Sequence, residues 1–274
     1  MMHTTTRVWR SLGLVAATLG LTAGVVVVAT SGAAVASSTK ITLDHFLCYK
    51  ATGKGFKVPS NVQLMNQLQT TKFRPKIGGT SALCNPANKQ VQKAAGGAPT
   101  TYLAVHPKSH LQCWAISYPF KPVPEVLINQ FGQGQMLVHA PVSLCLPSWK
   151  SLTGPPKTTA IAPTNLDHFT CYPLTPVGGA YGFKVPAVVK VEDEFSFPKY
   201  TTVKVGIGNF LCVPTWKFVG TKVYKPQAAN DKSLMCFPVF TTPVRNTVWT
   251  KNQFGKGKVF PTAKGEELCL PTVI

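Results

Sequence analysis

Apolar residues along the chain fall in short alternating or continuous runs, and no segment repeats them at the spacing of three and four that marks an amphipathic helix. The runs are rich in Val, Thr, Phe and Tyr and are separated by Gly and Pro. They predict strands at Ile41 to Lys50, Val62 to Leu68, Thr70 to Arg74, Glu125 to Phe131, Gln135 to Ala140, Val248 to Phe254 and Lys258 to Pro261. Two pairs of these strands flank short glycine segments at 132–134 and 255–257, which predicts hairpins that turn at the glycines. We therefore predict an all-β fold.

Two cysteine motifs alternate along the chain and divide it into four units of roughly 50 to 60 residues. The first motif surrounds Cys48, Cys113, Cys171 and Cys236. The second is Leu-Cys-x-Pro and contains Cys84, Cys145, Cys212 and Cys269. Between the two cysteines each unit carries a further signature, at Asn66-Gln67-Leu68, Asn129-Gln130-Phe131, Asp193-Glu194-Phe195 and Asn252-Gln253-Phe254. We expect its amides to hold turn backbone and its aromatic ring to fill the core, although the same residue types could line a sugar-binding groove.

A longer repeat is superimposed on these four units. Asp-His-Phe-x-Cys-Tyr occurs at 44–49 and again at 167–172, and each copy is followed by Gly-Phe-Lys-Val-Pro, at 55–59 and 182–186. This pairing of odd with even units predicts two tandem domains, 37–155 and 166–274, joined by a linker at 156–165. We expect each to be a small pseudo-two-fold barrel or sandwich that folds independently.

The first 36 residues are predicted to be an export signal. Arg7 and Arg10 precede an uncharged apolar stretch from Leu12 to Ala29, and Ala34-Val35-Ala36 has the small residues of a cleavage site. Cleavage after Ala36 predicts a secreted, extracellular protein with no transmembrane helix in the mature chain. An uncleaved membrane anchor is the alternative, because the apolar stretch is close to the shortest length that spans a bilayer.

Eight cysteines at repeated spacings in an exported chain predict disulfide bonds. Because the unit is the repeated entity, we predict bonds within units: Cys48 with Cys84, Cys113 with Cys145, Cys171 with Cys212 and Cys236 with Cys269. Bonds from Cys48 to Cys113 or to Cys145 respect the symmetry equally well and remain open at this point.

The chain is strongly basic. Its formal net charge of +19 falls to +17 when Arg7 and Arg10 are removed with the signal. For an exported protein this charge predicts an anionic partner, such as a cell-wall polymer, a glycan or a lipid surface, and we expect no nucleic acid in its physiological role. The alternative is that the lysines keep a strand-rich surface soluble and protect its edges.

Catalytic and metal chemistry have few candidates. His45, His110 and His168 each precede a cysteine by three residues, but a metal site there would need thiolates, which disulfides remove. We expect these histidines to satisfy backbone groups. The pairs Asp44-His45 and Asp167-His168 lack a Gly-x-Ser-x-Gly nucleophile, and Glu192-Asp193-Glu194 lacks the ligand spacing of a calcium loop. We predict no catalytic residue, metal or cofactor.

Two tryptophan–lysine pairs follow the second cysteine of their units, Trp149-Lys150 and Trp216-Lys217. A ring beside a cation suits sugars and anionic polymers, so these four residues are the candidate ligand surface. The alternative is that each Trp packs against the next unit.

The combination of His-Phe-x-Cys-Tyr, Asn-Gln-Phe-Gly and Leu-Cys-Val-Pro motifs resembles an uncharacterised family of secreted bacterial and archaeal proteins with tandem domains of unknown function. The resemblance covers residues 41 to 272 and implies extracellular location and a repeat architecture, but no activity. The chain departs from the pattern at Gln67-Leu68-Gln69, at Asp193-Glu194-Phe195 and at Ser233. We therefore predict a secreted, non-catalytic binding, adhesion or structural module, with a secreted hydrolase of unrecognised type as the alternative.

Overall fold

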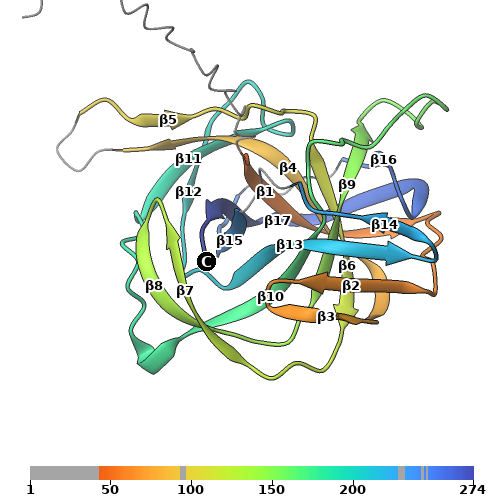
Figure 1. The fold of residues 1–274 in the computed structure, drawn as a ribbon. Helices are drawn as coiled ribbons and strands as arrows, with labels where there is room; N and C mark the ends of the chain where they lie inside the picture. The colour runs from red at the N-terminus through yellow and green to blue at the C-terminus, as the bar shows by residue number, and fades with distance from the viewer. Residues whose placement is uncertain (1–42, 93–96, 228–231, 242–243, 245) are drawn as a thin grey trace, which may run out of the picture. The chain divides into compact units, whose positions relative to one another are not determined.

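Eight antiparallel strands pair around a closed ring and form a barrel in the computed structural model (Figure 1). The structure describes residues 43–92, 97–227, 232–241, 244 and 246–274. Around the ring the strands are β1 (His45–Lys54), β4 (Lys76–Val91), β6 (His110–Ser117), β9 (Ser143–Ser151), β10 (Phe169–Pro176), β13 (Phe210–Val219), β15 (Ser233–Pro238) and β17 (Gly255–Thr272). Strand β17 returns to pair with β1 and closes the ring. The predicted all-β fold is confirmed, and a barrel is the architecture observed.

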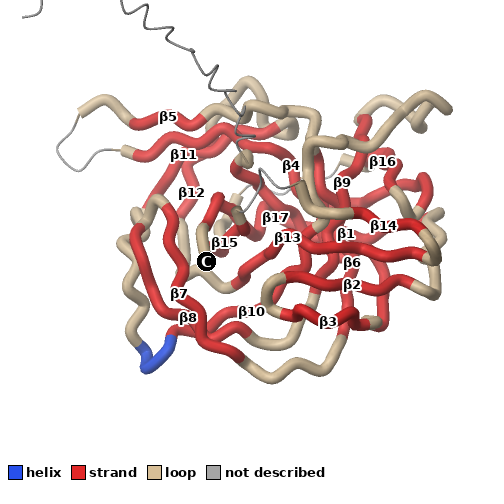
Figure 2. The backbone as a smooth tube through the Cα atoms, viewed as in Figure 1, coloured by secondary structure: helices blue, strands red, loops and turns tan. Residues whose placement is uncertain are grey.

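Helical structure is confined, in the part of the chain described, to one short 3-10 turn at Val177–Gly179 (Figure 2). Among these residues no helix has the length and apolar character needed to cross a membrane. The predicted export signal and its cleavage site after Ala36 lie outside the described residues.

The two strands that carry a unit's cysteines are neighbours in the ring, and their cysteines lie directly opposite each other. The resulting disulfides are Cys48–Cys84, Cys113–Cys145, Cys171–Cys212 and Cys236–Cys269, which confirms the predicted within-unit pairing. All eight side chains join one buried cluster. Sulfur atoms of adjacent units approach closely, at 3.7 Å for Cys48 and Cys269 and for Cys145 and Cys171.

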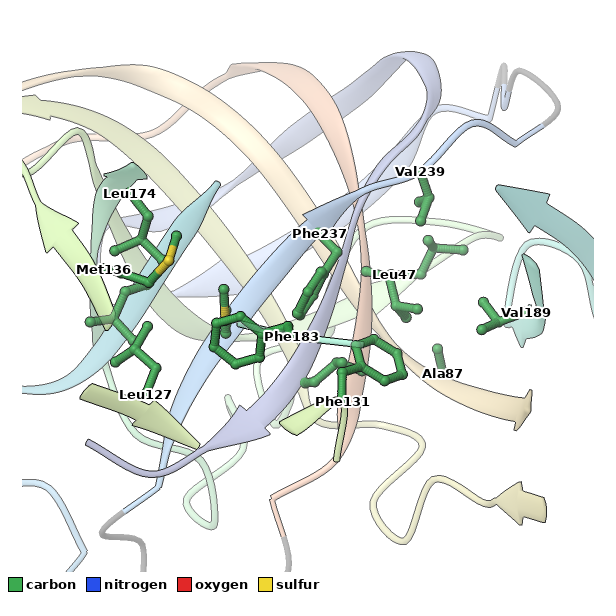
Figure 3. Close-up of a cluster of buried hydrophobic side chains, with 14 of the residues drawn as sticks. Leu47, Ala87, Leu127, Phe131, Met136, Leu174, Phe183, Val189, Phe237 and Val239 are labelled. Carbon is green, nitrogen blue, oxygen red and sulfur yellow. The ribbon is translucent and has the colours of Figure 1, made fainter. Parts of the chain in front are cut away.

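Both faces of the barrel strands are buried, because hairpins cover the outside. In β1, Phe46 and Cys48 belong to the cluster around the disulfides, whereas Leu47 and Tyr49 belong to a second cluster on the opposite face (Figure 3). Successive side chains of a strand point to opposite faces, so a strand covered on both sides needs an unbroken apolar run. The continuous run from Phe46 to Tyr49 meets this requirement.

Between its two barrel strands each unit contributes a hairpin. The hairpin strands are β2 (Val62–Asn66) with β3 (Gln69–Phe73), β7 (Val123–Asn129) with β8 (Gly132–Val138), β11 (Val188–Asp193) with β12 (Thr201–Lys204), and β16 (Val248–Asn252) with the start of β17. Two short strands, β5 (Thr100–Tyr102) and β14 (Lys222–Tyr224), extend the edges of β4 and β13.

The hairpin turns lie just before the glycine segments at which the sequence predicted them. Strand β7 ends at Asn129 and β8 begins at Gly132, so Gln130 and Phe131 form the turn. The glycine after each of these turns has a positive φ, 116° at Gly132 and 107° at Gly255, which favours glycine because it lacks a Cβ. The glycines therefore complete the turn and begin the returning strand.

Each hairpin packs on the unit two places along the chain. Strand β2 of the first unit pairs with β13 of the third, β11 of the third with β4 of the first, and β16 of the fourth with β9 of the second. The second unit's hairpin reaches the fourth through backbone pairing of Ile128 with Val273. This exchange links the first half of the chain to the second at every hairpin.

The described residues from 43 to 274 consequently belong to one compact unit. The predicted division into domains 37–155 and 166–274 is wrong, because β1 pairs with β17 and β9 pairs with β10 across it. The predicted linker at 156–165 joins two adjacent strands of one barrel. Ala160 within it is buried.

Candidate functional site

The residue that opens each hairpin signature holds its own turn. The side-chain oxygen Oδ1 of Asn129 accepts the backbone N–H of Phe131 at 2.8 Å, and that of Asn252 accepts the N–H of Phe254 at 2.8 Å. Asn66 and Asp193 each accept two successive N–H groups in the same way. Phe131 and Phe254 are buried. The prediction that the signature holds turn backbone and fills the core with its aromatic ring is confirmed.

A buried lysine stands five residues after the second cysteine in three of the units. These lysines are Lys89, Lys150 and Lys217, with exposed fractions of 0%, 8% and 0%. Each ammonium lies over the phenylalanine of the next unit's signature, at 5.2 Å from Phe131, 4.4 Å from Phe195 and 5.0 Å from Phe254. Such contacts partly compensate the cost of desolvating a cation.

Lys150 and Lys217 therefore do not share a surface with Trp149 and Trp216, as the sequence predicted. Adjacent residues of a strand face opposite sides, so the lysine points inward where the tryptophan points outward. The sequence itself indicates that the lysine and the ring of the next unit's signature are partners. In the fourth unit the lysine position is Ile274 and its partner signature has Leu68, and both apolar side chains pack against the same core cluster. Where the lysine is replaced by an apolar residue, the phenylalanine that it would contact is also replaced by an apolar residue.

The three histidines contact the same junctions. His168 Nε2 lies 2.9 Å from Gln253 Oε1, His110 Nε2 lies 3.4 Å from Glu194 Oε2, and His45 Nε2 lies 3.4 Å from Gln130 Nε2. Lys217 Nζ also donates to Gln253 Oε1. The prediction that these histidines satisfy backbone groups is therefore wrong for these nitrogens, since their partners are turn side chains of the next unit.

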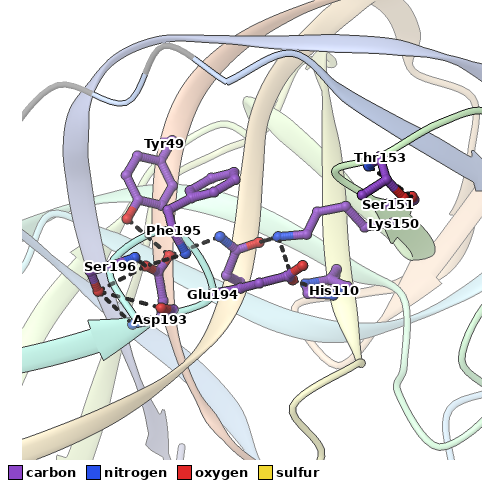
Figure 4. A network of polar contacts seen from close by, with 10 residues as sticks. Tyr49, His110, Lys150, Ser151, Thr153, Asp193, Glu194, Phe195 and Ser196 are labelled. Atoms are coloured by element: carbon purple, nitrogen blue, oxygen red, sulfur yellow. Dashed lines mark hydrogen bonds and ion pairs between the residues drawn. The ribbon is translucent and has the colours of Figure 1, made fainter. Parts of the chain in front are cut away.

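A polar network connects the first three units around Lys150 (Figure 4). Lys150 Nζ lies 2.9 Å from Glu194 Oε2 and donates to Asn85 Oδ1 at 2.5 Å. Asn85 Nδ2 and the Tyr49 hydroxyl both donate to Asp193 Oδ2, at 2.8 Å and 2.9 Å. Asp193 and Glu194, two of the carboxylates considered for a calcium site, thus bind the hairpin of unit three to units one and two.

Burial shifts the protonation of the junction groups. It lowers the pKa of His168 to about 3, assisted by the charge of Lys217, and lowers that of His45 to about 3, assisted by Lys89. Burial also lowers the pKa of Lys89 and of Lys217 to about 7. A pKa lowered by folding means that the folded protein disfavours the proton.

Replacing His168 with Ser, the residue at the equivalent position 233, is expected to make folding less sensitive to acid. Between pH about 3 and about 6.5 the unfolded chain binds a proton that folded His168 does not, so this stabilisation is present above 6.5 and is lost as pH falls toward 3. One such group adds a slope of about 1.4 kcal/mol per pH unit to the free energy of unfolding. Denaturant titrations of both proteins across this range measure the slope, and identical slopes would contradict the assignment.

The first Trp–Lys face is the outward side of β9, β16 and β17. In register across it lie Ser151, Trp249 and Lys258 in one row, and Trp149, Lys251 and Lys256 in the next. The alternate residues Lys150, Thr250 and Asn252 are buried on the inner side. Lys258 Nζ lies 4.7 Å from the centre of the Trp249 ring. Two rings and three cations therefore share one face, with no carboxylate among its six residues.

A groove runs beside Trp149 on this face. It has a volume of about 550 Å³ and is formed by Trp149 and Ser151 together with the following segment, including Thr153, Lys157 and Ile161. Lys251 Nζ donates to the carbonyl oxygen of Thr158 at 3.0 Å and ties this segment to the face. The volume lies within the range of pockets that hold small ligands or short polymer segments.

The second Trp–Lys face is the outward side of β13, β2 and β3. Trp216 and Phe218 stack with ring centres 6.5 Å apart and planes inclined by 21°. Lys225 Nζ lies 5.3 Å from the Trp216 ring, and Lys72 Nζ lies 4.2 Å from the Phe218 ring. The cation over the Trp216 ring is thus Lys225 and not the adjacent Lys217, and Lys72 lies over the neighbouring Phe218 ring.

The two remaining hairpin faces carry different chemistry. On β4 and β11, Asn88 Nδ2 donates to Glu192 Oε2 at 2.7 Å. Around the pairing of Ile128 with Val273, the exposed side chains are aliphatic: Val126, Ile128 and Val273. Rings and cations in combination therefore characterise the faces built on β9 and β13.

The other chemistry considered from sequence has structural explanations. All eight cysteines are in disulfides, so thiolate ligation of a metal is excluded. Within the described ranges no cluster of three His, Cys, Asp or Glu is arranged to hold a metal ion. Asp44 accepts the N–H groups of Val105 and His106 at 2.7 and 2.8 Å, and Asp167 accepts that of Gln227 at 2.9 Å. These aspartates anchor loops at the end of the barrel.

Comparison of the chain with protein-family models, with curated proteins and with solved structures found no match. The resemblance to the secreted repeat family therefore remains a prediction.

Proposed function

We propose that this protein is an exported, non-catalytic binding protein that holds an anionic polysaccharide on its first Trp–Lys face. The observation that supports this most strongly is the register of Trp149 and Trp249 with Lys251, Lys256 and Lys258 on one side of one sheet. A tryptophan ring offers a flat apolar surface for the C–H face of a sugar, and neighbouring ammonium groups attract its acidic substituents.

The distribution of charge favours a polyanion. Four of the nine acidic residues are buried, namely Asp44, Asp167, Glu192 and Asp193, and Glu194 is paired with Lys150. These five carboxylates are therefore withdrawn from competition with an external anion, while Lys256 and Lys258 are exposed. A surface of this kind attracts anions over distances comparable with the Debye length.

A polysaccharide fits the face better than a lipid surface does. Proteins that lie in a membrane interface bury protruding apolar side chains among the acyl chains. Trp149 and Trp249 are instead partly buried, and the ammonium of Lys258 lies over the Trp249 ring. A partly buried ring with a cation over it suits a ligand that brings sugar rings and anionic groups together.

The second Trp–Lys face offers a further contact for the same polymer. If one chain reaches both faces, the second contact is intramolecular, and avidity exceeds the affinity of either face. Export is part of this proposal and is supported by four disulfides, which persist in oxidising compartments, and by the predicted signal at 1–36 with cleavage after Ala36.

Replacing Lys251, Lys256 and Lys258 together with Gln is expected to weaken binding to polygalacturonate by about tenfold or more, because three exposed ion pairs of a few tenths to one kcal/mol are lost. The matched control replaces Lys184, Lys190 and Lys204, which are exposed elsewhere, with Gln and changes the net charge equally. We expect the control to weaken binding only about twofold to threefold, through the general field. Fluorescence titration in low salt gives both affinities.

An equal loss of affinity in the two triple variants would contradict binding at a defined face. It would indicate that the protein attracts the polymer only through its net charge. No binding of the wild type at low salt would favour the solubility role of the lysines. Tighter association with vesicles of acidic phospholipid than with the polysaccharide would favour a lipid surface instead.

A further inference from the structure

The groove beside Trp149 has an apolar side that a chain of uronic acids would leave in water. Ile161 lines this groove together with Pro155, and it is 74% exposed. No large apolar side chain in the described parts of the chain is more exposed than Ile161. A single exposed apolar residue is ordinary on a protein surface, but this one shares a groove with a tryptophan. The groove therefore offers apolar contact beyond the face of the Trp149 ring.

Hydroxyl groups line the same groove. Ser151, Thr153 and Thr159 contribute them, and Thr153 and Thr159 are exposed. Ser151 Oγ lies 3.3 Å from Thr153 Oγ1 and accepts the N–H of Thr153 at 3.2 Å, so the turn after β9 holds these two side chains together (Figure 4). A hydroxyl group both donates and accepts hydrogen bonds, which suits an uncharged polar ligand group. None of the described residues that line the groove is acidic.

The groove exists because the edge of β9 is not extended by a strand. Strand β5 extends the end of β4, and β14 extends the end of β13. Residues 152–161 follow β9 at the equivalent place and form no strand. The hydrogen bond from Lys251 Nζ to the carbonyl oxygen of Thr158 holds this segment against the face. The groove is therefore a feature of unit two that the other two edges lack.

The distance from the groove to the exposed lysines of β17 suits a repeat of two sugars. Strands β16 and β17 follow β9 in the sheet, so Lys256 lies two strands from Trp149 in the same row. Two strand spacings amount to about 10 Å, close to the length of two linked sugars. A polymer that crosses the strands in this direction places one sugar at the groove and an acidic neighbour at Lys256 or Lys258.

We propose that the groove binds an acetamido sugar, so that the polymer on the first Trp–Lys face alternates acetamido sugars with uronic acids. This inference rests on the proposed function and specifies its ligand. The sugar ring lies on Trp149, the methyl group of the acetamido substituent packs against Ile161, and its amide bonds with the hydroxyl groups of the groove. The carboxylate of the next sugar pairs with the exposed lysines of β17.

Size and chemistry favour this unit over a plain uronic acid. The groove volume of about 550 Å³ accommodates a substituted sugar. A uronic acid brings only hydroxyl groups and a carboxylate, and it leaves Ile161 in contact with water. An acetamido group brings a methyl group to bury and an amide that donates and accepts. Together these contacts are expected to raise affinity by about fivefold to tenfold.

The test compares two oligosaccharides of equal length on the intact mature protein at low salt. A hyaluronan oligosaccharide alternates acetamido sugars with uronic acids, whereas a galacturonate oligomer carries twice as many carboxylates. Attraction by charge alone makes the galacturonate the tighter ligand. We expect the hyaluronan oligosaccharide to bind more tightly by about threefold or more in calorimetry. Saturation-transfer NMR should show the strongest transfer to its acetamido methyl protons.

Ile161→Ser should reduce the preference for hyaluronan by about threefold or more and weaken the methyl signal. Leu103→Ser is the matched control, because Leu103 is 66% exposed outside the groove, and it should retain the preference. Near-ultraviolet circular dichroism establishes that both variants are folded. Equal or tighter binding of galacturonate by the wild type, or an unchanged preference in Ile161→Ser, would overturn the acetamido site and leave the polyanion proposal standing. If neither oligosaccharide binds, the proposed function fails and this inference fails with it.

Discussion

Residues 37–155 produced alone in an oxidising compartment are expected to remain unfolded, although they retain two complete cysteine pairs. Without the second half, β1 loses its partner β17 and β9 loses its partner β10, so the ring opens at two edges. The hairpin strand β2 also loses β13. The core cluster that contains Leu47 and Leu127 draws Tyr172, Leu211 and Leu268 from the second half. Near-ultraviolet circular dichroism of the fragment reports the outcome.

The matched control keeps both halves and breaks only the chain. Lys157 is exposed in the connection between β9 and β10, so full-length protein cleaved after Lys157 should stay associated and folded. A fragment 37–155 with native-like dichroism of its own would show that the halves are autonomous after all and that ring closure is dispensable.

Asp193→Ala is expected to destabilise the protein by about 3 to 5 kcal/mol, the range found when one partner of a buried charged network is removed. The substitution deletes the acceptor of the Tyr49 hydroxyl and of Asn85 Nδ2, and it releases the turn N–H groups of Phe195 and Ser196. Because Asn85 also accepts from Lys150, the loss extends to a buried cation. Denaturant unfolding gives the free energy change.

Asn129→Ala is the comparison that isolates the turn. Asn129 holds the equivalent turn through Phe131 N–H, but its amide nitrogen meets the sulfur of Met235, at 3.3 Å, in place of a carboxylate. We expect a cost of about 1 kcal/mol, as for loss of a capping side chain. Equal costs for the two substitutions would mean that the network around Asp193 contributes nothing beyond its turn.

The sequence was sufficient for the features that depend on neighbouring segments. The within-unit pairing of cysteines was predicted because the unit is the repeated entity, and the structure confirms it over the alternatives that the symmetry left open. The same repeat marked Asn66, Asn129, Asp193 and Asn252 as residues that hold a turn, although the predicted strands ran past three of these positions and the structure ends each strand at the marked residue. These are local relations, and a local pattern determines them.

Barrel closure could not be predicted in this way. Two barrels of two units and one barrel of four units require the same alternation, the same cysteines and the same turns within each unit. The two architectures differ in the strand with which β1 pairs and in the unit on which each hairpin packs. The repeat period is the same in both, so it does not distinguish them. The unbroken apolar run at Phe46 to Tyr49 was a sign that both faces of β1 are covered.

The candidate site was located in part. Trp149 and Trp216 lie on the surfaces where a ligand is proposed, but their cationic neighbours come from other strands. Trp249 and Lys258 join Trp149 from the fourth unit, and Lys225 joins Trp216 from beyond the end of β14. Because adjacent residues of a strand face opposite sides, Lys150 and Lys217 cannot lie beside the tryptophans that precede them. The lysines that do lie beside the tryptophans come from other strands, and the packing of the hairpins on other units determines which they are.

Lysine acetylation footprinting of the intact protein, with and without polygalacturonate at low salt, tests the proposed function most directly. We expect protection of Lys256 and Lys258, with weaker protection of Lys72 and Lys225 on the second face. Lys184, Lys190 and Lys204 should react equally in both samples. Protection spread evenly over all exposed lysines, or confined to those outside the two Trp–Lys faces, would contradict polysaccharide binding at these faces.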